Sequence, residues 1–434
     1  MDGVNGSMPK NKLVFIVLDG AADGLDPGTS LDLASIPNLD ELARMSRGGM
    51  HYPTGKGVAP ESDSAVFNLL GYNHEKYYIG RGPIEALGVG LDLKDEYEVA
   101  FRGNLATADF DKGVIIDRRV KRDISTEEAE KLTGKLRYID LGIYEGYAKV
   151  SVGLDYRLAV VIGSRKYRLS DEVSNTDPAY MKFGRISIAS SKYGNRIVNC
   201  SPIADTEEAK ITAKLVNQFI KVANEVLSNH PINQERVKKG KLPANTIILR
   251  DAGLKPKGIP RITKYYGINV IMLAEMPTEL GIARLIGAKA VKCRYISGRN
   301  PSEYSIRARD VINILKSEKA DLIYVHIKGP DVYGHDGDLE GKVKNLEDID
   351  KFFINEILNY QEIYSHSILV TMDHATPPSK KVHTGDPVPL ILYSNGIGND
   401  GLLRFYENEV LKKGSIGVLG YGWMILPIVK KLIW

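Results

Sequence analysis

The stretch Leu-Val-Phe-Ile-Val-Leu-Asp-Gly (13–20) decides the fold of this 434-residue chain. Its first six residues form a continuous apolar run, which predicts a strand that is buried on both faces, as in a parallel sheet. Ligands of open α/β sheets bind beyond the carboxyl ends of the strands, so Asp19 is at a candidate site position. The alternative is an ordinary turn in which Gly20 supplies a positive φ. The stretch alone leaves both interpretations open.

Two further apolar runs, 322–327 and 367–372, are also followed by polar residues. The carboxylate and imidazole residues after the three runs are Asp19, Asp331, His335, Asp373, His374 and His383. Three such strand ends are hard to explain as separate surface loops, so the sequence predicts a joint metal site. Carboxylate and imidazole without thiolate suit Mn²⁺, Zn²⁺, Co²⁺ or Fe²⁺. Six such ligands and a serine oxygen are too many for one tetrahedral ion, so we expect two ions that clamp a phosphoryl transfer.

The run Ala-Pro-Glu-Ser-Asp-Ser-Ala (59–65) contains the candidate nucleophile, Ser62. The residues from Asp63 to Leu70 resemble the first turns of a helix, so Ser62 would lie where backbone N–H groups favour an anionic phosphoryl group. A metal ion could stabilise its alkoxide. The alternative is that Ser62 only caps the helix, and the local sequence taken alone favours this role. The metal ligands shift the interpretation to a nucleophile.

Several short motifs, weak singly, form a specific set through their order and spacing. They are Val-Leu-Asp-Gly (17–20), Pro-Glu-Ser-Asp-Ser-Ala (60–65), Leu-Gly-Tyr (70–72), Gly-Arg-Gly-Pro-Ile-Glu-Ala (80–86), Gly-Asn-Leu-Ala-Thr (103–107), Asp-Arg-Arg (117–119), Gly-His-Asp-Gly-Asp (334–338) and Met-Asp-His-Ala-Thr-Pro (372–377). The set spans nearly the whole chain. It resembles the archaeal-type 2,3-bisphosphoglycerate-independent phosphoglycerate mutases, which belong to the alkaline phosphatase superfamily. The chain departs from many relatives at Glu61, where they carry Gly or Asn.

The resemblance implies a role for each site residue. One metal ion would be held by Asp19, Ser62, Asp373 and His374. The other would be held by Asp331, His335 and His383. The expected substrate-binding residues are Asp117, Arg118, Arg119, Arg122, Arg250 and Lys289. We expect two divalent ions, Mn²⁺ first with Zn²⁺, Co²⁺ or Mg²⁺ as alternatives, and no 2,3-bisphosphoglycerate. A guanidinium group binds a carboxylate or a phosphate through two parallel hydrogen bonds, so the arginines suit a substrate that carries both groups. The alternative is a solvated surface cluster, which is the more common role of Arg-Arg runs.

The implied reaction is the interconversion of 3-phosphoglycerate and 2-phosphoglycerate in glycolysis and gluconeogenesis, with a phosphoserine intermediate on Ser62. The alternative is a metal-dependent phosphatase or phosphodiesterase with the same nucleophile, against which the large insert and its arginines argue. A third hypothesis is a module that holds a metal for structural reasons. Structural metal sites are closed, often with Cys, and have no use for an exposed serine.

Composition narrows the class of protein. With 43% hydrophobic and 26% charged residues, the chain is typical of a globular protein. Its net charge of +4 is diffuse, which predicts no nucleic-acid partner, and no apolar run approaches the ~20 residues of a membrane span. The polar residues 1–7 suggest a disordered lead-in without a signal peptide. Two cysteines, Cys200 and Cys293, fit a reducing cytoplasm, and the oligomeric state is left open.

The length exceeds what one hydrophobic core holds, so two domains are expected. We predict an α/β fold with an alkaline-phosphatase-like mixed, mostly parallel sheet flanked by helices. This metal-binding domain would comprise residues 1–95 and 266–434, interrupted by a second α/β substrate-binding domain at 96–265. The insert should contain a strand near 99–103, an amphipathic helix over 205–227 and a strand over 245–250. A strand at 268–273 and a helix over 339–358 should follow it.

Overall fold

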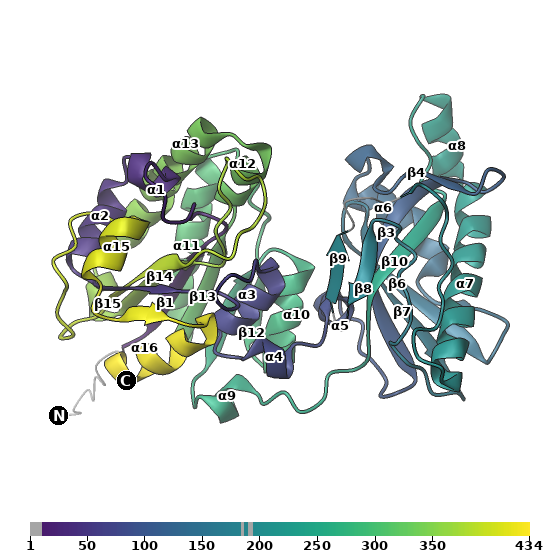
Figure 1. Cartoon of the computed structure of the whole chain (residues 1–434), viewed down its shortest axis with the longest axis horizontal. Helices are drawn as coiled ribbons and strands as arrows, with labels where there is room; N and C mark the ends of the chain where they lie inside the picture. Colours follow the sequence, from purple (N-terminus) through teal and green to yellow (C-terminus); the bar gives the residue numbers. More distant parts are fainter. Residues whose placement is uncertain (1–10, 184–185, 190–193) are drawn as a thin grey trace, which may run out of the picture. The chain divides into compact units, whose positions relative to one another are not determined.

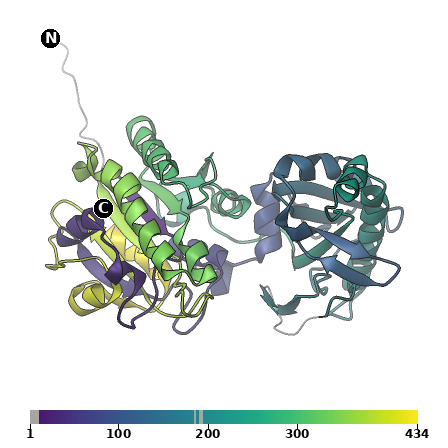
Figure 2. The same cartoon turned by 90° about the horizontal axis from the view of Figure 1, so that it is seen from above.

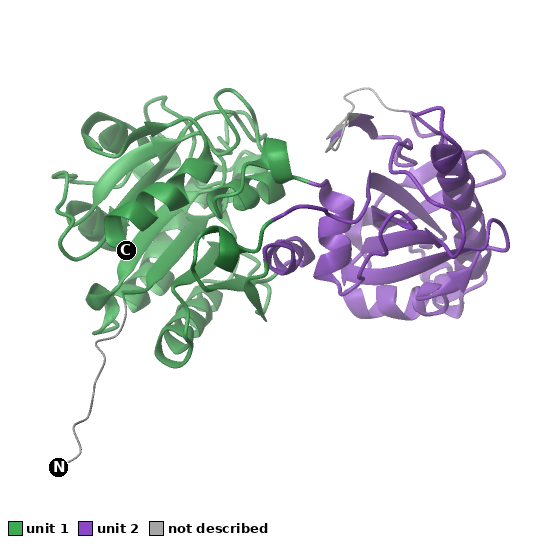
Figure 3. Ribbon diagram, turned by 90° about the horizontal axis from the view of Figure 1, so that it is seen from below, with its two compact units in different colours: residues 1–78, 260–275, 287–434 green, residues 79–259, 276–286 purple. Residues whose placement is uncertain are grey.

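The computed structural model describes residues 11–183, 186–189 and 194–434, and the chain divides into two compact units (Figure 3). The first unit comprises residues 1–78, 260–275 and 287–434, and the second comprises 79–259 and 276–286. Residues 79–95, predicted as part of the first domain, pack with the second unit. The predicted lead-in at 1–7 lies outside the described residues.

The first unit is built on an eight-stranded sheet with the strand order β12-β11-β13-β1-β14-β15-β2-β16. Its strands are β1 (Leu13–Leu18), β2 (Arg47–His51), β11 (Val270–Ala274), β12 (Lys289–Lys292), β13 (Leu322–Ile327), β14 (Ser367–Met372), β15 (Val388–Tyr393) and β16 (Gly417–Leu419). The neighbouring strands β12, β11, β13, β1 and β14 are parallel to one another, and β2 is parallel to β16. Strand β15 is antiparallel to both of its neighbours, β14 and β2. The predicted mixed, mostly parallel sheet is confirmed.

Helices flank this sheet, with α11 and α13 on one side of the strands and α16 on the other (Figure 1). The helices of the unit are α1 (Ser30–Leu33), α2 (Pro37–Arg44), α3 (Ser62–Leu69), α4 (His74–Tyr77), α9 (Ile262–Tyr265), α11 (Ser302–Ser317), α12 (Pro330–Asp336), α13 (Leu339–Ile349), α14 (Asn355–Leu358), α15 (Glu407–Lys413) and α16 (Ile425–Ile433). Every residue of β1, β13 and β14 is buried, as their unbroken apolar runs predict. The predicted helix over 339–358 contains a π-helical turn at Asp350–Ile354 between α13 and α14.

The second unit contains an antiparallel sheet with the order β10-β3-β7-β6-β5, and β4 pairs with β3. Its strands are β3 (Glu98–Asp109), β4 (Val114–Asp117), β5 (Ile139–Asp140), β6 (Gly146–Leu154), β7 (Arg157–Ser164) and β10 (Thr246–Gly253), and β8 (Tyr180–Phe183) pairs with β9 (Ile186–Ala189). Its helices are α5 (Arg81–Gly88), α6 (Thr126–Leu132), α7 (Glu207–Ser228), α8 (Pro231–Lys238) and α10 (Pro277–Ile286). The long helix α7 lies along the sheet and buries an apolar stripe against it (Figures 1 and 2). None of the described helices is long and apolar enough to cross a membrane.

A buried carboxyl, Glu407, ties helix α15 to the loop that follows β1. The Glu407 side chain accepts hydrogen bonds from the backbone N–H of Asp23 at 2.9 Å and from the hydroxyl of Thr29 at 2.7 Å. Burial raises the pKa of Glu407 to about 7, and these two donors lower it only in part. Because Asp23 lies four residues after Asp19, this contact helps to position the candidate site.

Glu407 should make stability depend on pH. The pKa of Glu407 is raised from 4.5 in the unfolded chain to about 7 in the fold, so the folded state holds the proton more tightly. The stabilisation of the fold by the protonated carboxyl is therefore fully present below pH 4.5 and is lost as the pH rises through 7. The shift corresponds to an upper bound of about 3 kcal/mol. We expect Glu407→Gln to flatten the fall in the melting temperature between pH 5 and pH 8. Glu409→Gln on the same helix is the control and should keep the wild-type slope, and an unchanged slope in Glu407→Gln would contradict the assignment.

Candidate active site

Three neighbouring parallel strands deliver polar residues to one edge of the first unit's sheet. In this sheet Leu18 of β1 is aligned with Ile327 of β13 and with Met372 of β14. The residues that follow these strands directly are Asp19, Lys328 and Asp373. Because the three strands run in the same direction and end at the same level, their polar residues leave the sheet side by side.

The first cluster, named group one here, consists of Asp19, Asp373, His374 and Ser62. The Nε2 atom of His374 lies 3.4 Å from Oδ1 of Asp19, 3.3 Å from Oδ2 of Asp373 and 3.2 Å from Oγ of Ser62. Asp19 Oδ1 and Asp373 Oδ2 are buried and make no hydrogen bond within the described part of the chain. Two buried carboxylate oxygens facing an imidazole nitrogen call for a positive charge among them. The donor set therefore fits a divalent cation.

The second cluster, group two, consists of Asp331, His335 and His383. The two Nε2 atoms lie 3.2 Å apart and 3.5 and 3.4 Å from Asp331 Oδ1. The Nδ1 atom of His335 lies 3.0 Å from the carbonyl oxygen of Lys381, and that of His383 lies 2.7 Å from the carbonyl oxygen of Pro60. A carbonyl only accepts, so both Nδ1 atoms donate and both Nε2 atoms face the carboxylate, as in imidazoles that bind metals.

The electrostatics of the two groups agree with this geometry. Burial lowers the pKa of His383, but the hydrogen bond to Asp331 and its charge outweigh burial and raise that pKa to about 9. Burial also raises the pKa of Asp19, yet Lys328, His374 and other neighbours hold it well below its usual range. Asp19, Asp331 and His374 offer ligand atoms within 4.8 Å of one another, so the two groups are adjacent.

Ser62 is the first residue of helix α3, and Glu61 takes the N-cap position. The serine hydroxyl therefore does not cap the helix, and it points instead at Nε2 of His374 in group one. The side chain is half-buried, whereas Glu61 is exposed. The helix N-terminus at this position favours an anionic group bound to the serine.

His326 and Lys328 were missed by the sequence analysis. Lys328 Nζ lies 3.2 Å from Asp19 Oδ2 and 3.1 Å from Nδ1 of His326. An ammonium group only donates, so Nδ1 of His326 accepts and its Nε2 carries the proton, 3.3 Å from Asp373 Oδ2. His326 thus lies beside Asp373 of group one. The available signal was position, because both residues stand at the end of the strand that precedes Asp331.

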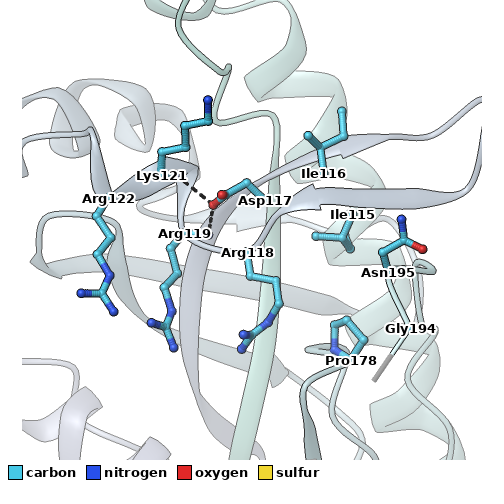
Figure 4. A pocket seen from close by; sticks show the side chains of 10 residues that line it. All are labelled: Ile115, Ile116, Asp117, Arg118, Arg119, Lys121, Arg122, Pro178, Gly194 and Asn195. Carbon is cyan, nitrogen blue, oxygen red and sulfur yellow. Dashed lines mark hydrogen bonds between the residues drawn. The ribbon is translucent and has the colours of Figure 1, made fainter. Parts of the chain in front are cut away.

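The predicted arginine cluster lines a cavity of about 520 Å³ in the second unit (Figure 4). The cavity is lined by Ile115, Ile116, Asp117, Arg118, Arg119, Lys121, Arg122, Pro178, Gly194 and Asn195. The side chains of Arg118, Arg119 and Arg122 extend side by side in one direction, and Lys121 extends the opposite way (Figure 4). Among the described residues, the guanidinium groups of Arg119 and Arg122 make no ion pair, so they are available to an anion.

A strained turn presents these arginines. Val120, Lys121 and Arg122 have φ values of 50°, 52° and 56°, a left-handed conformation that is rare for a β-branched residue such as valine. Asp117 Oδ1 accepts hydrogen bonds from the backbone N–H groups of Arg119 at 2.8 Å and Lys121 at 2.9 Å. Asp117 therefore holds the turn in shape. Strain of this kind costs roughly 1–3 kcal/mol per residue and clusters at functional sites.

Arg118 and Arg250 differ from the other arginines because both are bound to the buried Asp177. Arg118 donates to both carboxylate oxygens, at 2.6 and 2.7 Å, and Arg250 donates to Oδ2 at 2.9 Å. Both guanidinium groups also lie over the ring of Tyr180, at 5.3 and 4.1 Å from its centre. Asp177 was not anticipated from the sequence, and it fixes these two arginines in one orientation.

Lys289 does not lie with the other candidate residues of the first unit. It opens the edge strand β12, is exposed, and pairs with Glu318 at 2.7 Å. The register aligns Lys289 with Ile271, which is aligned in turn with Ile323 of β13. That level is the amino-terminal half of the strands, away from the carboxyl edge where group one begins. Lys289 therefore lies apart from groups one and two.

Comparisons with known proteins agree on one family. The model of the 2,3-bisphosphoglycerate-independent phosphoglycerate mutase family matches residues 43–233. The chain is 40% identical over 427 residues to the 2,3-bisphosphoglycerate-independent phosphoglycerate mutase of Aeropyrum pernix, covering 97% of this chain and 99% of the relative. It is 37% identical over 430 residues to the 2,3-bisphosphoglycerate-independent phosphoglycerate mutase 1 of Archaeoglobus fulgidus, covering 96% of this chain and 99% of the relative.

Two solved structures have the same fold. The PH0037 protein from Pyrococcus horikoshii gives a TM-score of 0.75 at 27% identity, covering 98% of this chain and 97% of that one. The cofactor-independent phosphoglycerate mutase from Thermoplasma acidophilum gives a TM-score of 0.64 at 29% identity, covering 98% and 100%. The similarity in sequence thus extends over nearly the full length of these relatives. The chain belongs to the 2,3-bisphosphoglycerate-independent phosphoglycerate mutase family.

Proposed function

We propose that the protein interconverts 3-phosphoglycerate and 2-phosphoglycerate through a phosphoserine on Ser62, without 2,3-bisphosphoglycerate. The observation that carries this proposal is the position of Ser62 Oγ, 3.2 Å from His374 Nε2 and beside two buried carboxylate oxygens that make no hydrogen bond within the described residues. Divalent cations bound by groups one and two, with Mn²⁺ as the first candidate, would stabilise the serine alkoxide and neutralise charge on the phosphoryl oxygens.

Residues of the chain itself carry the phosphoryl group and hold the substrate. Ser62 gives up its hydroxyl proton and its Oγ attacks phosphorus, the bond to the 3-oxygen of glycerate breaks and that oxygen takes up a proton, and the phosphoryl group stays on Ser62. The 2-hydroxyl of the retained glycerate then loses its proton as it attacks the phosphoserine, and the oxygen of Ser62 is released and protonated again. The N-terminus of α3 favours the anionic phosphoserine. Guanidinium groups such as that of Arg119 would bind the carboxylate of glycerate, which keeps glycerate from being lost and water from taking its place.

The same nucleophile and cation groups would also serve a phosphatase, so the product decides between the two functions. Purified protein should be supplied with Mn²⁺ and 3-phosphoglycerate without 2,3-bisphosphoglycerate, and the products followed by ³¹P NMR. We expect 2-phosphoglycerate to accumulate to an equilibrium mixture with little free phosphate. Free phosphate as the main product would support the phosphatase and reject the mutase. The cytoplasmic location stays a prediction.

Arg119 should control the ratio of these two products. Arg119→Ala removes a guanidinium that has no ion pair within the described residues. The substitution should therefore weaken the binding of the substrate and leave the stability of the protein nearly unchanged. We expect a loss of about 2 kcal/mol, or roughly 30-fold in kcat/KM, typical of a charge-assisted contact. Free phosphate should rise relative to 2-phosphoglycerate, because poorly held glycerate gives water time to reach the phosphoserine.

The matched control is Lys121→Ala, which removes a cation from the same turn. The Lys121 side chain extends away from the three arginine side chains (Figure 4). It should keep kcat/KM within a few-fold and leave the product ratio unchanged. Arg118→Ala is a poorer test, because it would leave buried Asp177 with one guanidinium fewer. If Arg119→Ala and Lys121→Ala behave alike in rate and product ratio, the cluster is solvated surface and its proposed role is wrong.

A further inference from the structure

Thr376 links the two candidate cation groups through a single hydroxyl. It is fully buried, two residues after His374 in the loop that follows β14. Its Oγ1 donates a hydrogen bond to Oδ1 of Asp331 at 2.8 Å and lies 2.9 Å from Nδ1 of His374. One side chain that is a ligand in neither group therefore contacts a member of each.

The direction of these hydrogen bonds follows from the number of protons. A hydroxyl has one proton to donate, and an ionised carboxylate can only accept, so the proton of Thr376 goes to Asp331. Nδ1 of His374 must then carry a proton and donate it to Thr376 Oγ1. This tautomer leaves the lone pair on Nε2, the atom that faces Ser62, Asp19 and Asp373. Outer hydrogen bonds of this kind fix the tautomer and ring orientation of imidazoles that bind metals.

We propose that Thr376 is a positioning residue for cation binding, which sets the tautomer of His374 and the orientation of Asp331 at the same time. The inference rests on the proposed function in that groups one and two bind divalent cations. It goes beyond the proposed function by assigning the coupling of the two groups to Thr376, which contacts His374 of group one and Asp331 of group two.

The backbone holds Thr376 in place independently of its hydroxyl. The N–H of Thr376 donates to the carbonyl oxygen of Ala22 at 2.9 Å. The ammonium of buried Lys342 donates to the carbonyl oxygens of Thr376 at 2.9 Å and Ala22 at 3.3 Å, and to Asp23 at 2.5 Å. Gly20 leaves room for the hydroxyl, since a Cβ there would lie 2.8 Å from Thr376 Oγ1. Removing the hydroxyl alone should therefore leave the loop where it is.

The test compares Thr376→Val with Thr376→Ser. Valine has the shape of threonine without the hydroxyl, and serine keeps the hydroxyl without the methyl group. Mn²⁺ binding to the metal-free protein should be measured from the electron paramagnetic resonance signal of free Mn²⁺, a readout that does not depend on mutase activity. We expect Thr376→Val to weaken binding about 10–100-fold, and Thr376→Ser to stay close to the wild-type protein.

Circular dichroism at the assay temperature should confirm that each variant is folded. If Thr376→Val does not fold, Thr376→Ala against Thr376→Ser isolates the same hydroxyl. Wild-type Mn²⁺ affinity in the variant that lacks the hydroxyl overturns the inference, as does equal weakening in the serine variant. Failure of the proposed function looks different: the wild-type protein would bind Mn²⁺ but would not convert 3-phosphoglycerate.

Discussion

Replacing Ser62 by alanine is expected to lower kcat by roughly 10³–10⁶-fold while the protein stays folded, the range seen when a covalent nucleophile is removed. Ser62 is the first residue of α3 and its hydroxyl is not part of the helix cap. The substitution therefore removes the atom that would carry the phosphoryl group without removing a contact that supports the helix. The change should fall on kcat, because the substitution removes the nucleophile and leaves in place the cationic side chains that would bind the anionic substrate.

Ser64→Ala is the matched control for this substitution. Ser64 lies in the same helical turn, and its hydroxyl donates to the carbonyl oxygen of Glu61 at 2.8 Å. Loss of that exposed hydrogen bond should cost stability of about 1 kcal/mol and leave kcat nearly unchanged. Comparing the two variants separates the chemical role of a hydroxyl from its effect on the helix.

Mass spectrometry gives a direct measurement of the intermediate. A reaction of the wild-type protein with 3-phosphoglycerate, quenched in acid, should carry phosphate on the peptide that contains Ser62. Fragmentation should place the group on Ser62 and not on Ser64, and the peptide from Ser62→Ala should carry none. Near-normal turnover by Ser62→Ala would reject the phosphoserine mechanism, whatever the fate of the metal groups.

The sequence was most informative where one short segment carries the whole signal. The apolar runs of β1, β13 and β14 show both that these strands are buried and where each ends. Because neighbouring parallel strands end at the same edge of the sheet, the polar residues that follow them lie close together. The strand near Val99, the helix over 205–227 and the strand over 245–250 were predicted for the same reason. Each is long enough for its own period to be recognised.

Contacts between distant segments were not predictable in this way. Residues 79–95 were predicted to belong to the first domain, yet α5 packs on α10 at very close range. A Cβ on Gly281 would lie 1.9 Å from the carbonyl oxygen of Ile84, and one on Gly88 would lie 1.8 Å from that of Pro277. Only glycines at both crossing points permit this approach, and their pairing across nearly 200 residues leaves no local pattern.

Hydrogen-bond partners of the charged residues were also not predictable from the sequence. Asp117 was expected to bind substrate, and its carboxylate also holds the left-handed turn through two backbone N–H groups. Arg118, Arg119 and Arg250 were all expected to bind substrate, and the structure shows that Asp177 binds Arg118 and Arg250. Residue type and spacing give the charge of a cluster, whereas the partners decide which of its charges remain available.

Removing divalent cations is expected to abolish activity, and adding Mn²⁺ should restore it, with two ions bound per chain. In the metal-free protein the pKa of His383 is raised to about 9 by Asp331, so a cation entering group two must displace a proton. Below pH 9 the affinity of that site should therefore fall about tenfold per pH unit. His335→Asn should reduce the number of bound ions from two to one, because its Nε2 faces only group two.

Asp338→Asn is the control for the loss of a nearby polar group. Asp338 caps α13, three residues after His335, and its carboxylate accepts from the backbone N–H of Gly341. Asparagine can cap in the same way, so this variant should keep both ions. Cations that bind only the folded state should also raise its stability, by about 2.7 kcal/mol at a hundred times Kd. Full activity in excess EDTA, after elemental analysis shows no bound metal, would mean that the convergent carboxylates and imidazoles act by holding protons instead of cations.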